Sequence, residues 1–351
     1  MKKYKVIGLM SGSSLDGVDL AYCEFSYDTK WHYKIIKTQT ISYPEEWAIA
    51  LAEMPNQPGS GLIEFDISYG KYLGELAVEF IENNGLNPDL ISSHGHTVFH
   101  SPEKGFTFQL GNGQAIASAT GIKTICDFRI GDIQLGGQGA PLVPIGDKFL
   151  FPEYDFCINI GGIANISFDR NNKRVAFDIC PANQLLNHLS RQVGKPFDEN
   201  GNIAQLGKLN KPLFEKLNNY SYYALPYPKS MSNQLVKNEF INIIDNSDTT
   251  VEDSLYTVCK HIAYQIKDVT KEVAGDKFLI TGGGAHNNFL VTAIERELMQ
   301  KVIVPNRQIT DFKEALIFAF MGTLRFEEKT NCLASATGAC RDSSVGVVYI
   351  P

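Results

Sequence analysis

Three apolar segments of this sequence each lead directly into a turn built of small residues. Ile7 precedes "GLMSGSS", Ile158 precedes "NIGGIAN", and Ile280 precedes "TGGGAHN". Such turns at strand ends expose backbone N–H groups, and their lack of side-chain bulk lets a ligand approach closely. One turn alone is weak support for a binding site. Three of them predict that one ligand, most readily an anion, is held from several sides.

Between these turns, segments whose apolar residues have strand spacing alternate with segments whose apolar residues have helix spacing. This succession is typical of an α/β protein. The strand-like segments are residues 5–10, 16–25, 88–100, 154–168 and 277–281. The helix-like segments are residues 68–85, 181–193, 254–273 and 313–328, with a further helix beginning near Asn288.

Length and composition limit the architecture and the partners. A chain of 351 residues exceeds the usual limit of a single core, so we expect two domains with a cleft. A net charge of -7 argues against nucleic acid and anionic membranes as partners. Seven scattered cysteines without a C-x-x-C pair, no signal peptide and no membrane-length apolar run predict a cytoplasmic protein.

The first turn, "SGSSLDG", is on its own most often a plain hairpin turn. In the functional interpretation, the N–H groups and hydroxyls of Gly12, Ser13 and Ser14 wrap terminal phosphates. The lysine of a P-loop is missing and a hairpin follows in place of a helix, which argues against P-loop NTPases and dinucleotide dehydrogenases.

The other two turns differ in how strongly they indicate a binding site. "GGIAN", from Gly161 to Asn165, is equally consistent with a tight bend between two core strands. "GGGAHN", from Gly282 to Asn287, carries three consecutive glycines, each costing up to about 1 kcal/mol relative to alanine. We interpret it as the approach of a phosphate or nucleotide to the N-terminus of the following helix.

Polar side chains at other strand ends are candidates for chemistry. Asp178 ends an apolar strand, and it is either a carboxylate at a helix N-terminus or a general base. His94 and His96 lack a nearby cysteine or carboxylate, so they form only a weak metal signal. Arg129 is the best anchor for a substrate carboxylate, with an ordinary salt bridge as the alternative.

Together and in order, the motifs resemble the anhydro-N-acetylmuramic acid kinase family over essentially the whole chain. They are "GLMSGSSLDGVDLA", "SHGHTVFH", "DFR" with "GGQGAPLVP", "NIGGIANISF", "FDICPAN", "GGGAHN", "EALIFAF" and "ATGA". The resemblance implies the two-lobed fold of sugar kinases, Hsp70 and actin. Each lobe is then a five-stranded mixed sheet with helices, and Mg-ATP binds in the cleft. The expected N-terminal lobe is residues 1–127 with 336–351, and the C-terminal lobe is residues 128–335.

The resemblance also implies the site residues. Asp178 matches the family's catalytic aspartate, and Glu314 lies at the matching helix start near the sugar. The expected ATP contacts are Gly12, Ser13, Ser14, Leu15, Asp16, Gly17, Val18, Asp19, Gly161, Gly162, Gly282, Gly283, Gly284 and Asn287. The expected sugar contacts are His94, Thr97, Arg129 and Asn183.

The implied reaction uses ATP and Mg²⁺ to open 1,6-anhydro-N-acetylmuramic acid and to phosphorylate O6, giving N-acetylmuramic acid 6-phosphate for cell-wall recycling. Asp178 deprotonates the water that attacks C1. Two alternatives stay open: a kinase of the same fold for another amino sugar or sugar acid, and an inactive nucleotide-binding regulator. Homodimerisation is also left open.

The sequence departs from the family pattern at several positions. The family usually reads "DTGPGN" where this chain has "DICPAN", so Ile179, Cys180 and Ala182 replace smaller or polar residues beside Asp178. It usually has "HGQT" where His96 stands, and a histidine where Asp147 stands. The larger side chain of Cys180 is expected to narrow the space next to Asp178.

Overall fold

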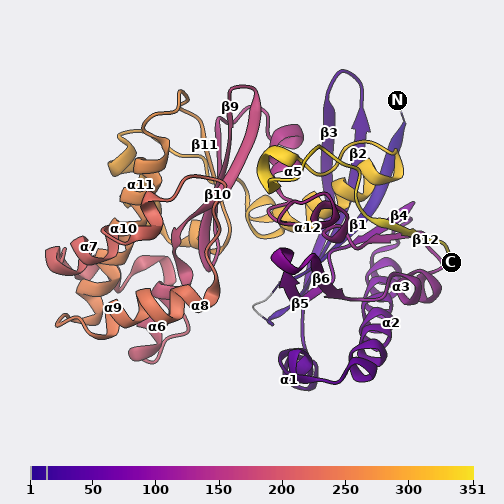
Figure 1. Ribbon diagram of the computed structural model, residues 1–351, viewed down its shortest axis with the longest axis horizontal. Coiled ribbons are helices and arrows are strands. Elements are labelled where there is room, and N and C mark those ends of the chain that lie inside the picture. Colours follow the sequence, from indigo (N-terminus) through magenta and orange to yellow (C-terminus); the bar gives the residue numbers. More distant parts are fainter. Residues whose placement is uncertain (1, 13–14) are drawn as a thin grey trace. The chain divides into compact units, whose positions relative to one another are not determined.

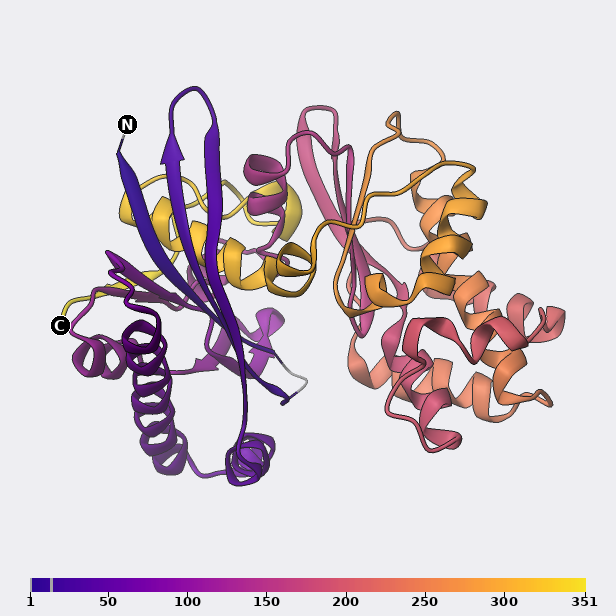
Figure 2. The same cartoon turned by 180° about the vertical axis from the view of Figure 1, so that it is seen from behind.

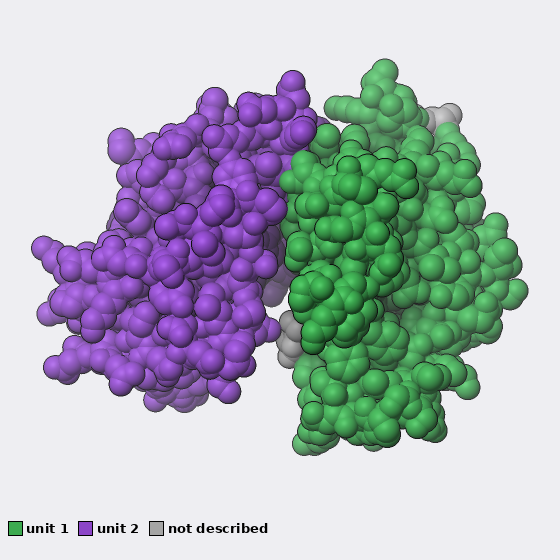
Figure 3. Space-filling view, viewed as in Figure 1, with its two compact units in different colours: residues 1–151, 312–351 green, residues 152–311 purple. Residues whose placement is uncertain are grey.

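The computed structural model describes residues 2–12 and 15–351. Ser13 and Ser14 of the first turn therefore lie outside the described residues. The chain divides into two compact units, coloured separately in Figure 3. Unit 1 contains residues 1–151 and 312–351, and unit 2 contains residues 152–311.

Unit 1 is built mainly from the N-terminal part of the chain (Figure 1). Its strands are β1 (Lys3–Ser11), β2 (Gly17–Tyr27), β3 (Trp31–Ser42), β4 (Leu90–Ser93), β5 (His96–Ser101), β6 (Phe106–Leu110), β7 (Thr124–Cys126) and β12 (Val347–Tyr349). Its helices are α1 (Glu45–Glu53), η1 (Met54–Asn56), α2 (Gly59–Asn84), η2 (Pro102–Lys104), α3 (Gly113–Thr120), α4 (Ile130–Gln134), α5 (Pro144–Leu150), α13 (Ala334–Thr337) and most of α12 (Arg307–Phe326).

The main sheet of unit 1 is mixed and has helices on both faces (Figure 2). Its order is β12-β7-β4-β1-β2-β3, in which β1, β4 and β7 are parallel and the other neighbours are antiparallel. Because strand residues alternate between faces, Ile7 packs with α2 while Gly8 lies against Ala315 of α12. A side chain at Gly8 would meet the Ala315 carbonyl, so the glycine permits this close helix packing.

Unit 2 holds the other mixed sheet. Its strands are β8 (Phe156–Ile160), β9 (Ile163–Arg170), β10 (Lys173–Pro181) and β11 (Phe278–Thr281). Its helices are α6 (Asn183–Gln192), η3 (Glu199–Gly201), η4 (Ala204–Leu206), α7 (Lys211–Asn218), η5 (Ser221–Ala224), α8 (Asn233–Leu235), η6 (Val236–Ile241), α9 (Asn242–Asp245), α10 (Val251–Thr270), η7 (Gly283–His286) and α11 (Asn288–Leu298).

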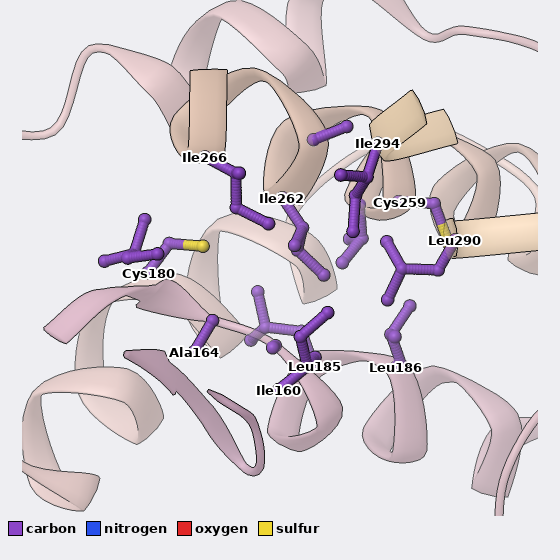
Figure 4. Packing of buried hydrophobic residues seen from close by; sticks show 14 of the residues in the cluster. Ile160, Ala164, Cys180, Leu185, Leu186, Cys259, Ile262, Ile266, Leu290 and Ile294 are labelled. Carbon is purple, nitrogen blue, oxygen red and sulfur yellow. The ribbon is translucent and has the colours of Figure 1, made fainter. Parts of the chain in front are cut away.

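The sheet order of unit 2 is β10-β9-β8-β11, an antiparallel meander followed by a parallel strand. Unit 1 has the same arrangement in β3-β2-β1-β4, so the repeated pattern expected from the sequence is present in the topology. Strand residues such as Ile160 and Ala164 pack against α6, α10 and α11 to form the core of unit 2 (Figure 4).

The α/β class with mixed sheets is confirmed, but the strand counts differ from the expected five in each lobe. The described residues form a six-stranded and a four-stranded main sheet. In unit 1, the chain's C-terminal segment adds β12 beside β7. In unit 2, a fifth strand is reduced to one parallel bridge between Leu279 and Ile303. Pro305 follows closely, and proline cannot donate a ladder hydrogen bond.

The boundaries of the two units also differ from those of the expected lobes. The expected C-terminal lobe was residues 128–335, whereas unit 2 contains residues 152–311. Residues 128–151 and 312–335 belong to unit 1 by their packing. Helix α12 explains part of this difference: it lies on the unit 1 sheet, where Ser92 donates a 2.5 Å hydrogen bond to the carbonyl of Phe318. The boundary falls within α12 at Phe312, whose backbone angles are not helical (φ -114°, ψ 16°).

Among the helices of the described residues, none is long and apolar enough to span a membrane. The apolar segment of α12, which includes Ala315 to Met321, is buried core, as its sequence predicts.

Candidate functional site

Asp178 lies near the end of β10, where the strand pairing is irregular. The register with β9 shifts between Asp178 and Cys180. Such a bulge re-aims the side chains around it. Asp178 is half-buried, and its Oδ2 accepts a 2.8 Å hydrogen bond from the backbone N–H of Met231.

The surroundings of Asp178 change its acidity. Burial raises the pKa of this carboxyl group to about 6, although the Met231 N–H acts in the opposite direction. Within residues 2–12 and 15–351, the hydrogen bond to Oδ2 is the only one made by the carboxyl group. A half-buried carboxylate with a pKa near neutrality is chemically suited to accept a proton.

The departures beside Asp178 are accommodated in the core. Ile179, Cys180 and Ala182 are all fully buried in unit 2. Figure 4 shows the Cys180 sulfur directed toward Ile266 of α10. The Cys180 side chain therefore belongs to the apolar cluster of unit 2, and its effect on the space beside Asp178 stays a prediction.

The "GGIAN" turn joins β8 to β9 and is tied to the start of α6. The carbonyl of Gly161 accepts a hydrogen bond from the backbone of Asn183, and that of Gly162 accepts bonds from Ala182 and Gln184. The Asn183 side chain donates to the carbonyl of Ile160 at 3.1 Å. These bonds hold the turn close to the strand that carries Asp178.

The three glycines of "GGGAHN" differ in what surrounds them. Gly282 has a φ of +84°, and a side chain there would lie 2.6 Å from the Asn159 amide oxygen. A side chain at Gly284 would collide with Ile160. At Gly283 the nearest atom would be the Asn183 amide nitrogen at 3.6 Å. Two of the glycines therefore serve packing, and only Gly283 leaves open space.

A recess of about 700 Å³ opens beside this turn in unit 2. Phe197, Val304 and Pro305 supply apolar surface. The lining also contains His286 and Arg307, which both bond to Asp311, and the acidic Asp198 and Glu199. Of the predicted residues, the lining includes Asn183, Gly283, Gly284 and Asn287, but not Asp178, Gly161, Gly162 or Gly282. Asn287 also has a structural role, because its side chain caps α11 by accepting a 2.9 Å bond from Leu290.

In unit 1, the first turn lies between β1 and β2, as predicted. Of the expected ATP contacts here, Gly12 and Leu15 to Asp19 are described. Leu15 adopts a positive φ of 58°. Val18 is fully buried, and Asp19 accepts a 2.5 Å hydrogen bond from Thr40. The side chain of Val18 therefore belongs to the core rather than to a ligand surface.

A cluster of hydroxyl groups behind this turn was not predicted. Tyr43, Tyr69 and Ser11 bond to one another, with oxygen separations of 2.5 to 2.9 Å. His96 lies 3.4 Å from the Ser11 hydroxyl and also contacts the backbone of Gly12. Tyr69 has the spacing of an apolar helix face, so the sequence contains no signal that separates it from ordinary core.

Arg129 and His94 form a hydrogen-bonded pair, which neither the "DFR" motif nor the "SHGHTVFH" motif predicts on its own. Arg129 donates from Nε and Nη2 to His94 Nε2, at 3.1 and 2.7 Å, and from Nη1 to the carbonyl of Gly139 at 2.7 Å. His94 Nε2 is thus an acceptor, so the ring proton is on Nδ1 and bonds to the Gly95 carbonyl at 2.8 Å. Burial and the Arg129 charge lower the pKa of His94 to about 3.

The predicted residue Glu314 lies close to this pair. Burial raises the pKa of its carboxyl group, while the charges of Arg129 and Lys313 act against that shift. Lys313 itself forms a 2.7 Å ion pair with Asp147, and both side chains are almost completely buried. Thr97, the remaining predicted sugar contact, lies on β5 and accepts a 3.4 Å hydrogen bond from Gln109.

Comparison with known proteins adds an independent observation. A family model described as anhydro-N-acetylmuramic acid kinase matches residues 4–351. Curated relatives of that name are 34% identical in Saccharophagus degradans, over 100% of both chains, and 35% identical in Aliivibrio fischeri, over 99% of both chains. This chain belongs to the anhydro-N-acetylmuramic acid kinase family.

The family resemblance read from the motifs is therefore confirmed, and the chain is an enzyme of the kinase class. The comparisons give no support to the alternative of an inactive regulator or of a kinase for another sugar. Among solved structures, a ROK family glucokinase from Streptomyces griseus with glucose and AMPPNP is similar at 11% identity. That similarity covers 91% of this chain and 99% of the other, with a TM-score of 0.44.

Proposed function

We propose that this kinase opens 1,6-anhydro-N-acetylmuramic acid with water and transfers the γ-phosphoryl group of ATP to O6 of the sugar. In the anhydro sugar, O6 is bound to C1 and cannot accept a phosphoryl group until that bond breaks. The water oxygen bonds to C1, the water proton passes to Asp178, and the freed O6 takes the phosphoryl group. The products are N-acetylmuramic acid 6-phosphate and ADP.

The placement of Asp178 is the observation that carries this proposal: it is half-buried at the bulge near the end of β10, and one carboxyl oxygen is held by the Met231 N–H. Its pKa of about 6 leaves it ionised at neutral pH, yet basic enough to accept a proton in the transition state. The Met231 N–H holds Oδ2, so Oδ1 is the atom that accepts the proton from water. A general base of this kind typically contributes a factor of about 10² to 10⁴ in rate.

The recess of unit 2 fits a nucleotide. Its apolar wall suits a planar base, and the open face of Gly283 leaves room for close approach. The backbone of the first turn, from Gly12 to Asp19, is proposed to face the phosphates, with Ser13 and Ser14 included. Mg²⁺ generally binds through substrate phosphates, waters and one or two carboxylates, so we propose that it arrives with ATP.

The sugar is assigned to residues of unit 1. Arg129 has five N–H donors, of which three are used by His94 and Gly139. Its remaining donors can bind the carboxylate of the muramic acid lactyl group. We assign Glu314 to the hydroxyl groups of the sugar, where a carboxyl group with a raised pKa can exchange protons.

We further propose a cytoplasmic enzyme. No disulfide joins any of the seven cysteines, all of which lie in the described part of the chain, and this fits a reducing compartment. A homodimer is the assembly to be tested by light scattering.

The reaction is tested by ADP release on addition of the anhydro sugar, together with the mass of the product. The expected product is heavier than the substrate by one phosphoryl group and one water. ATP binding without sugar-dependent ADP release would overturn the proposed function. ADP release with an unhydrated product would overturn only the ring-opening step.

A further inference from the structure

A segment from Tyr222 to Met231 contacts Asp178 at three points. The backbone N–H of Met231 donates to Asp178 Oδ2 at 2.8 Å, and the Tyr222 hydroxyl donates to the Asp178 carbonyl at 2.8 Å. The Asp178 N–H donates to the carbonyl of Lys229 at 3.2 Å. These residues lie 44 to 53 positions further along the chain, so tertiary folding brings them to the carboxylate.

The side chain of Lys229 closes this segment on itself. Its Nζ donates to the carbonyls of Tyr222 and Tyr223 in η5, at 3.2 and 3.3 Å. The same ammonium group lies 4.6 Å from the ring centroid of Tyr222 and 5.8 Å from that of Phe177. Since Phe177 directly precedes Asp178 on β10, Lys229 links the two ends of the segment to the strand that carries the proposed base.

We propose that Lys229 is a positioning residue, which keeps the Met231 N–H against Asp178 by tying the segment to η5 and β10. This inference rests on the proposed function of Asp178. The Lys229 ammonium group bonds to the carbonyls of Tyr222 and Tyr223, whereas the Asp178 carboxyl group bonds to Met231. Lys229 acts through the backbone of Met231 and through Tyr222.

The consequence for Asp178 is a change in its titration. The Met231 N–H stabilises the carboxylate, so loss of that bond raises the pKa of Asp178. The charge of Asp178 also acts on two nearby titratable groups, Cys180 on β10 and Tyr222 on η5, and burial raises the pKa of both. Strand β9 places the uncharged Asn165 opposite Asp178.

The test compares Lys229→Met, Lys229→Arg and the matched control Lys237→Met, whose lysine is exposed on η6. Labelling with ¹⁵N-methionine follows amide exchange at Met231 among only 6 methionines in the wild type and one more in each Lys→Met variant. Carboxyl ¹³C NMR follows the titration of Asp178, assigned by its absence in Asp178→Asn. For Lys229→Met, we expect exchange about tenfold faster and a pKa about one unit higher, the size of one lost hydrogen bond to a charged group.

Lys229→Arg should largely restore both values, because arginine can donate to two carbonyls, and Lys237→Met should resemble the wild type. The acid limb of the kcat/KM profile should move upward with the Asp178 pKa. A shifted titration with unchanged Met231 exchange would mean that Lys229 acts only by its charge, and would overturn the proposal. Unchanged titration and exchange would overturn it as well. If the wild type lacks sugar-dependent ADP release, the proposed function fails, while the two NMR measurements still decide the role of Lys229.

Discussion

Replacing Asp178 by asparagine separates a catalytic carboxylate from a structural one, because the two roles predict opposite changes in stability. The pKa of about 6 compares with an ordinary value of 3.8. Each pKa unit corresponds to 1.36 kcal/mol, so the ionised Asp178 lowers the free energy of unfolding by about 3 kcal/mol at neutral pH. This value is an upper limit, since the neutral amide is also desolvated. Asparagine keeps an oxygen that can accept from Met231.

The sign of the pH dependence follows from the raised pKa. The folded wild type binds the proton more tightly than the unfolded chain, so its stability falls as the pH rises from about 4 to about 6. Asp178→Asn does not titrate in this range. The variant should therefore be more stable than the wild type at pH 8, by up to about 3 kcal/mol, and this advantage should shrink toward pH 4.

The assays are urea unfolding at several pH values and sugar-dependent ADP release. We expect turnover to fall by about 10² to 10⁴, with ATP affinity unchanged. Near wild-type turnover of the folded variant would refute the role of Asp178 as general base, and Glu314 would then be the next candidate for that role. A variant less stable than the wild type at pH 8 would refute the argument from burial, and would indicate a helix-terminal carboxylate worth about 1 kcal/mol.

Further outcomes follow from the same structure. Below about pH 6, kcat/KM of the wild type should fall tenfold for each pH unit as Asp178 is protonated, and a flat profile from pH 5 to 8 would contradict this. Gly283→Val should weaken ATP binding measured by calorimetry by at least about tenfold with little change in melting temperature, because its side chain would enter the recess; unchanged affinity would remove Gly283 from the site. Lys313→Met should destabilise unit 1 by about 3 to 5 kcal/mol by removing its buried ion pair with Asp147, and adding Asp147→Asn should recover much of that loss. Cys180→Gly should lower stability by about 1 to 3 kcal/mol and leave the KM for the sugar unchanged, since the thiol packs in the core; a changed KM would return this residue to the substrate site.

Local patterns predicted the elements that carry the site. The helix expected near Asn288 is α11, and the apolar stripe of residues 254–273 overlaps α10, which ends at Thr270. Each small-residue turn lies at a strand end. These features depend on contacts between near neighbours in the chain, so periodicity and turn composition are sufficient to find them.

Element boundaries were less predictable where local signals conflict. The expected strand over residues 88–100 is divided into β4 and β5, because Gly95 adopts a positive φ of 72° between them. The expected helix over residues 68–85 begins earlier, at Gly59, although two glycines in its first turn are poor helix formers. Packing of α2 on the sheet outweighs that local cost.

The sequence by itself determined the family, the α/β class and the positions of Asp178, Glu314 and the three turns, because these are carried by residue type and order. Only the tertiary structure decided which of these features border open space and how their acidic groups titrate. Gly282 and Gly284 proved to be packing glycines, while Gly283 borders open space. The acidity of Asp178 depends on its burial and on Met231, 53 residues away. The physical reason is that steric room and desolvation are set by atoms far apart in the chain, which no local pattern encodes.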